Sequence, residues 1–133
     1  ERADGDATVS FIRKWSRVHD LPRPIRRYVA TGRIAPTAAK HIARLGGEAR
    51  YMLAWAALDH GLTVREIRAV VSRVNKNQTV EEALLAEGVR LGEMQIQLPP
   101  GTYRRLRRAA AVEDVDPDEL LADAVDAYLD DEA

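Results

Sequence analysis

The stretch Gly61-Leu62-Thr63-Val64-Arg65-Glu66 marks the clearest helix boundary in the chain. Gly61 ends an Ala- and Leu-rich segment, residues 48–60, which we predict to be a helix. Thr63 and Glu66 have the spacing of a capping box, in which the two residues satisfy free backbone N–H groups reciprocally. Apolar residues at helical spacing follow, at Ile67, Val70, Val71 and Val74. The stretch therefore predicts two helices joined by a tight turn.

Proline and glycine divide the preceding chain into further short helices. One is predicted from Pro24 to Gly32 and another from Pro36 to Gly46. A longer helix is predicted to run from about Asp6, its N-cap, to about His19, with its apolar residues on one half of the helical wheel. The polar run at residues 75–78 breaks the pattern, so we place one helical domain over residues 1–78.

The chain changes character after residue 78. A second capping box, which begins at Thr79, predicts a connecting helix within residues 79–92. Residues 93–98 alternate strictly between polar and apolar side chains, which predicts a strand, and two helices follow, from about Thr102 to Val112 and from Pro117. Because a lone strand is unstable, we expect it to pair with the same strand of a second copy. The alternative is an extended linker whose alternation arises by chance.

Charge is distributed unevenly along the chain. The 133 residues carry a formal net charge of -1, but residues 1–80 sum to +8 and residues 81–133 to -9. Within residues 8–44, nine basic residues accompany one acidic residue, Asp20. Such an asymmetry predicts a polyanionic partner for the N-terminal half.

Composition and motifs argue against several classes of protein. The absence of cysteine rules out disulfides and thiolate zinc sites, and no apolar run is long enough to span a membrane, so we expect a cytoplasmic protein. His19, His41 and His60 lack metal-ligand spacing, and no phosphate-binding glycine loop occurs. We therefore predict that the protein is not an enzyme, with no catalytic residues, no metal and no cofactor.

Residues 17–74 resemble the helix-turn-helix domain of the ParB/KorB family of DNA-partition and transcription-control proteins. The resemblance rests on Arg17 to Leu21-Pro22, on residues 29–34 and 39–40, and above all on residues 61–66. It implies that the helix from Ala7 to His19 occupies the place of the recognition helix. It also implies that this domain, residues 1–78, is truncated at its N-terminus.

Residues 93–130 are similar to ribbon-helix-helix repressors of the Arc/MetJ/CopG type. In that family paired strands enter the DNA major groove, which implies that Gln95 and Gln97 read bases. The order of the two modules is similar to that of an uncharacterised haloarchaeal DNA-binding-protein family. The fold class that we predict is therefore mainly α, with a helix-turn-helix bundle followed by a β-strand–helix–helix module over residues 93–133.

These observations predict a sequence-specific, dimeric DNA-binding protein that acts at the nucleoid as a transcriptional regulator or in replicon partition. The predicted partners are double-stranded DNA and a second copy, with no membrane contact. The residues predicted to contact DNA are Thr8, Ser10, Arg13, Lys14, Arg17, Arg23, Arg26, Arg27, Lys40, Arg44, Gln95 and Gln97. Those predicted to form the dimer are Met94, Ile96, Leu98, Leu121 and Val125. The alternative is an antitoxin-like dimer whose acidic C-terminal end binds a basic partner protein.

Overall fold

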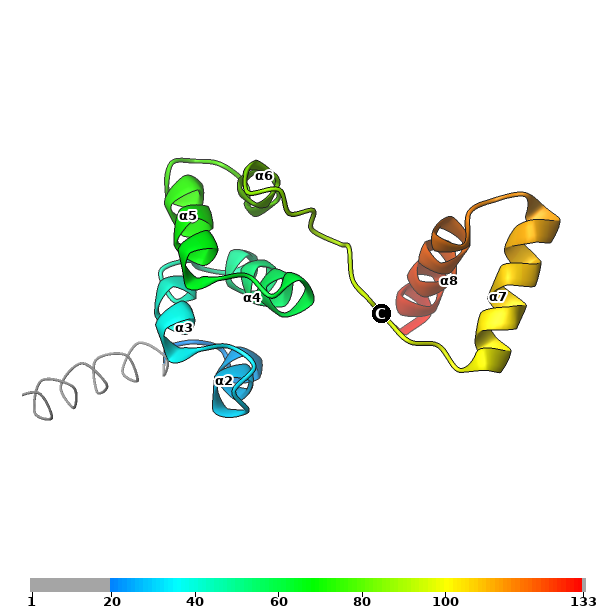
Figure 1. The fold of residues 1–133 in the computed structure, drawn as a ribbon, viewed down its shortest axis with the longest axis horizontal. Helices are drawn as coiled ribbons and strands as arrows, with labels where there is room; N and C mark the ends of the chain where they lie inside the picture. The colour runs from blue at the N-terminus through cyan, green and yellow to red at the C-terminus, as the bar shows by residue number, and fades with distance from the viewer. Residues whose placement is uncertain (1–19, 133) are drawn as a thin grey trace, which may run out of the picture. The chain divides into compact units, whose positions relative to one another are not determined.

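The structure is a computed structural model that describes residues 20–132, and within that range it consists of helices and the segments that connect them (Figure 1). The chain divides after Gln95 into two compact units. The helices are α2 (Arg23–Ala30), α3 (Pro36–Ile42), α4 (Glu48–His60), α5 (Val64–Asn75), α6 (Val80–Ala86), α7 (Pro100–Glu113) and α8 (Pro117–Glu132). The helix predicted to end near His19 lies outside the described residues.

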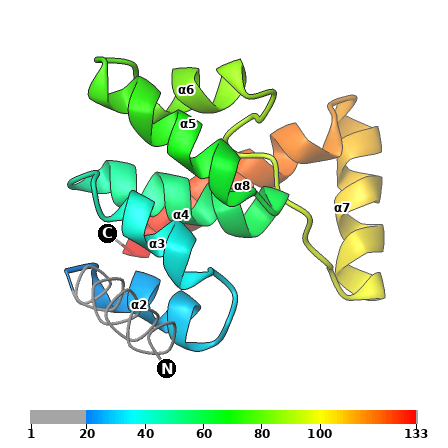
Figure 2. The same ribbon diagram turned by 60° about the vertical axis from the view of Figure 1, so that its left-hand side comes forward.

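The first unit has one hydrophobic core, to which all five of its described helices contribute. Each helix supplies a large side chain that is fully buried: Ile25, Ile42, Leu53, Ile67 and Leu84, in the order α2 to α6. Helix α3 packs against α4 and α5, and α6 packs against α4 and α5, as Figure 2 shows for α5 and α6. Complete burial of each such side chain contributes about 1.5–3 kcal/mol to folding. The predicted connecting helix is thus part of this core.

The capping box predicted at the start of α5 is confirmed. The backbone N–H of Glu66 donates to Thr63 Oγ1 over 3.1 Å, and the backbone N–H of Thr63 donates to Glu66 Oε1 over 2.9 Å. At the start of α6 only one half of the predicted capping box forms. The backbone N–H of Glu82 donates to Thr79 Oγ1, but the Glu82 carboxylate accepts a hydrogen bond from the Thr79 hydroxyl instead of from the Thr79 backbone N–H. Gly61 ends α4 at a φ of +61°, a left-handed conformation that glycine adopts without steric cost.

The prediction of a C-terminal strand is wrong. Residues 93–98 form an extended connection between α6 and α7, and no strand occurs among residues 20–132. Alternation indicates a strand only where one face is buried, but Met94 and Ile96 are 61 % and 51 % exposed. Without a neighbouring backbone there is no ladder, so the predicted ribbon-helix-helix module is absent, and the alternative of an extended linker describes these residues.

The second unit is a hairpin of α7 and α8. Helix α7 begins at Pro100, two residues before the predicted start, because proline at a first helical position gives up no hydrogen bond. The turn between the helices contains Asp114 with a φ of +57°. Among residues 96–131, only Ala110 is buried. The hairpin taken alone therefore has almost no hydrophobic core.

Candidate nucleic-acid interface

The three arginines of α2 lie on its solvent side. Ile25 and Val29 are buried in the core, so the positions between and before them, Arg23, Arg26 and Arg27, are exposed. None of the three forms an ion pair within residues 20–132. Their guanidinium groups are therefore accessible to an anion.

Helix α3 contributes the second group of predicted contacts. Lys40 is half-buried in its last turn and Arg44 is exposed in the turn that follows. Between them, His41 points into the protein and leaves its Nδ1 atom without a hydrogen-bond partner. Burial, together with the positive charges of Arg44, Lys40 and Arg68, lowers the pKa of His41 below its ordinary value.

Helix α5 carries a polar stripe that the sequence analysis did not identify. The stripe lies opposite the buried residues Ile67 and Val70. Together with Arg44 it encloses a hollow of about 710 Å³, lined by Arg44, Arg65, Arg68, Ala69, Val71, Ser72, Asn75 and Lys76. We call this the α3–α5 hollow. The signal was available, because Arg65, Arg68, Ser72 and Asn75 are spaced three or four residues apart, which places them on one side of a helix.

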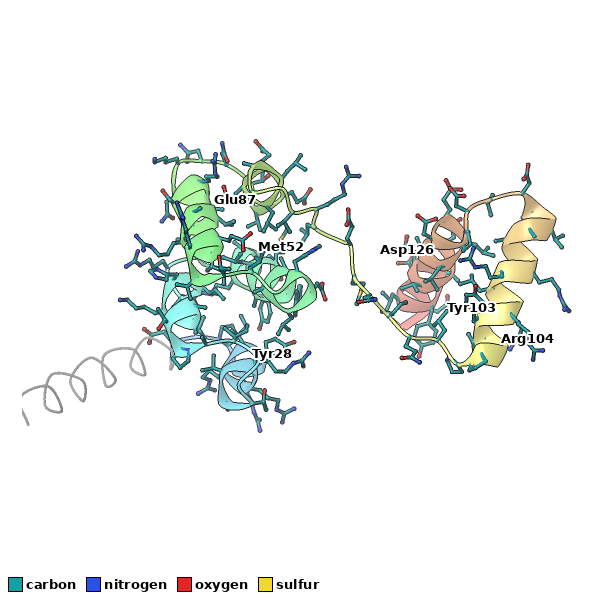
Figure 3. The ribbon with its side chains drawn as sticks, viewed as in Figure 1. Tyr28, Met52, Glu87, Tyr103, Arg104 and Asp126 are labelled. Atoms are coloured by element: carbon teal, nitrogen blue, oxygen red, sulfur yellow. The ribbon has the colours of Figure 1, made fainter. Side chains whose placement is uncertain are left out.

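Among residues 20–132, no acidic residue lines the α3–α5 hollow. The two ion pairs among the described residues lie elsewhere, between Arg73 and Glu87 at 3.6 Å and between Arg90 and Glu93 at 3.5 Å; Glu87 is labelled in Figure 3. The four cations of the hollow thus have no carboxylate partner within residues 20–132, and the hollow is a region of positive potential.

Arg50, in the first turn of α4, holds the chain on both sides of Arg44. Its guanidinium donates hydrogen bonds to the backbone carbonyl oxygens of Ala43, over 2.9 Å, and of Leu45, and a weaker one over 3.2 Å to that of Asp20. The carbonyl groups of Ala43 and Leu45 follow the end of α3 and that of Asp20 precedes α2, so Arg50 satisfies backbone oxygens that lie outside the described helices. Arg50 is therefore a positioning residue for Arg44, and no local pattern in the sequence indicates this role.

The two glutamines predicted to read bases do not lie on a common ribbon. Gln95, in the first unit, borders a hollow of about 680 Å³ lined by Tyr28, Arg33, Trp55, Leu58, Asp59, Met94 and Gln95. In this hollow the Arg33 guanidinium lies 5.5 Å from the centre of the Tyr28 ring. Gln97 is exposed in the second unit. The structure thus removes the geometry on which their predicted role depended.

The residues predicted to form the dimer separate in a similar way. Met94 belongs to the first unit, and Ile96 is exposed at the start of the second. Leu98 and Leu121 meet in an apolar groove of about 430 Å³ between α7 and α8, whereas Val125 is 45 % exposed on α8. The predicted contacts at Thr8, Ser10, Arg13, Lys14 and Arg17 lie outside the described residues.

Two other kinds of site are not present among residues 20–132. Residues 20–132 contain no group of three His, Asp or Glu side chains placed to hold a metal ion. None of the described helices is long and apolar enough to cross a membrane. The exposed cations of α2, α3 and α5 are therefore the main candidate site in this part of the chain.

A family model described as a family of unknown function (DUF7119) matches residues 1–89, more than half of the chain. The matched region includes α2 to α6 and stops before α7. No curated protein and no solved structure matches the chain.

Proposed function

The chain belongs to the family of unknown function DUF7119, and we propose that it binds double-stranded DNA through the cationic side of its first unit. The observation that carries the proposal is a set of exposed cations on α2, after α3 and on α5, namely Arg23, Arg26, Arg27, Arg44, Arg65, Arg68 and Lys76, which form no ion pair within residues 20–132. DNA is a linear polyanion, and proteins bind it chiefly by neutralising phosphates with arginine and lysine. In this assignment Arg23, Arg26 and Arg27 contact the sugar–phosphate backbone.

Backbone contacts give affinity but no sequence preference. We assign base recognition to the segment that precedes α2, because Thr8, Ser10, Arg13, Lys14 and Arg17 combine short hydrogen-bonding side chains with cations. This assignment rests on the sequence pattern. It makes the protein a sequence-specific regulator or partition protein, with a binding role that needs no cofactor.

A salt series tests the proposal. Binding of random duplex DNA is measured by fluorescence anisotropy from 50 to 300 mM salt for the wild type and for the double variant Arg26→Ala/Arg27→Ala. Each lost phosphate contact reduces the log–log salt slope by about 1, so we expect the variant's slope to fall by about 2.

The matched control is Arg33→Ala/Arg90→Ala, which removes the same charge from exposed positions of the first unit that lie outside α2, α3 and α5. This variant should bind DNA as the wild type does. A wild-type slope near zero would refute DNA binding, and an equal loss in the control would show that net charge, rather than this surface, governs it.

We also propose that the second unit associates with a second copy of the chain. Its hairpin buries only Ala110 among residues 96–131, while Tyr128 and Leu129 are 65 % and 55 % exposed. So small a helical unit does not supply enough buried apolar surface to be stable alone. Val125, Tyr128 and Leu129 are exposed at helical spacing on α8, and exposed apolar side chains gathered on one side of a helix favour an association face.

Charge on the hairpin favours a second copy over an unrelated partner. Helix α7 has four arginines and one acid, whereas α8 has seven acids and no base; Arg104 on α7 and Asp126 on α8 are both exposed (Figure 3). No ion pair joins the two helices within the described residues. In a two-fold arrangement, α7 of each copy lies beside α8 of the other copy, so the arginines of α7 face the carboxylates of α8 at two equivalent places.

Mass measurement by sedimentation equilibrium tests this association. The wild type should be a dimer, and Leu121→Asp should be a monomer, because the substitution places a charge in the apolar groove. Leu85→Asp is the matched control, since Leu85 is 61 % exposed on α6 of the first unit, and it should remain dimeric. A monomeric wild type would exclude the second copy and favour a basic partner protein for α8.

A further inference from the structure

We propose that the α3–α5 hollow is a preformed site for a phosphodiester group of the nucleic-acid backbone. This inference rests on the proposed function and adds a second contact region to it, separate from the arginines of α2. The site is formed by Arg44 after α3 and by Arg65, Arg68 and Lys76 along α5.

The donors of the hollow match the chemistry of phosphate. Arginine guanidinium groups bond phosphate oxygens in a bidentate manner, and a lysine ammonium adds a compact charge. Ser72 and Asn75 supply a neutral hydroxyl and a neutral amide among the cations. Because no carboxylate of the described residues lines the hollow, none of their side chains repels an anion there or competes with it for the guanidinium groups.

The site is rigid before a ligand arrives. Arg50 bonds to the backbone on both sides of Arg44, and α5 is fixed at its start by the capping box of Thr63. The opposite side of α5 is anchored in the core by Ile67 and Val70. Since the scaffold is already ordered, binding immobilises mainly the side-chain tips, which limits its entropic cost.

The lining favours the DNA backbone over a free nucleotide. A site for a nucleotide needs an apolar or aromatic surface for the base, but the only apolar side chains here are Ala69 and Val71. With a volume of about 710 Å³, the hollow is large enough for a phosphate together with parts of its neighbouring sugars. A site built in this way contributes affinity without reading sequence.

The test is the double variant Arg65→Ala/Arg68→Ala in the full chain, assayed for duplex DNA by anisotropy in a salt series. We expect affinity to fall about tenfold or more on every duplex sequence, with a salt slope that is smaller by about 1 to 2. The preference among duplex sequences should not change. The control Arg33→Ala/Arg90→Ala removes the same charge from exposed positions that do not line the hollow.

A second variant guards against an effect on folding. Ser72 is exposed, so Ser72→Glu leaves the core intact but places a carboxylate inside the hollow, while Ser72→Ala removes only the hydroxyl. Ser72→Glu should weaken DNA binding about as much as the double arginine variant. Ser72→Ala removes one neutral donor and adds no charge, so it should weaken binding much less than Ser72→Glu does. Unchanged urea midpoints would confirm that all these variants are folded.

The outcomes separate the two proposals. If the wild type does not bind DNA, the proposed function fails and this inference fails with it. If the wild type binds DNA and both hollow variants bind equally well with an unchanged slope, only the hollow assignment is wrong. Titration with inorganic phosphate distinguishes a free anion from a DNA phosphate as the ligand. If phosphate binds the hollow but the hollow variants retain full DNA affinity, the hollow is a site for free anions, and the assignment to the DNA backbone is overturned.

Discussion

Replacing Arg50 by alanine should destabilise the first unit far more than replacing any of its exposed arginines. The guanidinium of Arg50 makes two partly buried hydrogen bonds, to the carbonyls of Ala43 and Leu45, and one exposed bond to that of Asp20. A hydrogen bond to a charged group contributes about 1.5–3 kcal/mol, and an exposed one much less. If the exposed bond is neglected and the freed carbonyls partly rehydrate, the expected loss is about 2–4 kcal/mol. This is a large share of the ~5–15 kcal/mol that stabilises a typical domain.

Urea unfolding followed by circular dichroism measures this loss. Arg50→Ala should lower the midpoint with the slope unchanged, because the substitution alters stability without altering the surface exposed on unfolding. Arg50→Lys should recover less than half of the loss, since one ammonium group cannot reach carbonyls that two separate guanidinium nitrogens reach. Arg26→Ala, at an exposed site, is the control and should stay within about 0.5 kcal/mol of the wild type. A loss below ~0.5 kcal/mol for Arg50→Ala would refute the reasoning.

Three further predictions concern the same unit. Leu53→Ala should cost about 2–5 kcal/mol in urea unfolding because the side chain is fully buried; a smaller cost would mean that the core collapses around the gap. Thr63→Ala should cost about 1 kcal/mol through loss of the N-cap, and an unchanged midpoint would show that the cap adds nothing. His41 has a lowered pKa in the native protein, so the unfolded chain takes up a proton first and stability should decline as pH falls through about 6.5. His41→Gln should make that decline shallower between pH 7.5 and 5, and an identical pH profile would contradict the assignment.

Local sequence signals predicted most of the helix boundaries. The prolines at positions 24 and 36 have a fixed φ that suits the start of a helix, and Gly61 tolerates the positive φ that ends one. Thr63 caps α5 by bonding to Glu66, only three positions away. Such signals need no knowledge of distant contacts. The helices α2 to α5 were therefore predictable, and the observed starts of α4 and α5 agree with the predicted ones.

The errors arose where structure depends on distant parts of the chain. Alternation at residues 93–98 has the same pattern in a strand and in a linker, and only a neighbouring backbone decides between them. The role of Arg50 was equally hidden, because its carbonyl partners are set by how α4 packs on the end of α3. The polar stripe on α5 has a spacing that is readable in the sequence. Exposed polar side chains at that spacing are equally typical of an ordinary solvated helix surface, so the spacing alone does not predict a site.

The extended connection before α7 has a further consequence for hydrogen exchange. The backbone N–H groups of residues 94–98 make no hydrogen bond within the described part of the chain, and most of their side chains are exposed. In deuterated water these amides should exchange at close to the rate of an unstructured peptide, while those of Leu53 and Val70 in the core of the first unit exchange far more slowly. A partner that orders the connection would slow amide exchange at residues 94–98. The exchange rates of these residues therefore report binding next to this segment.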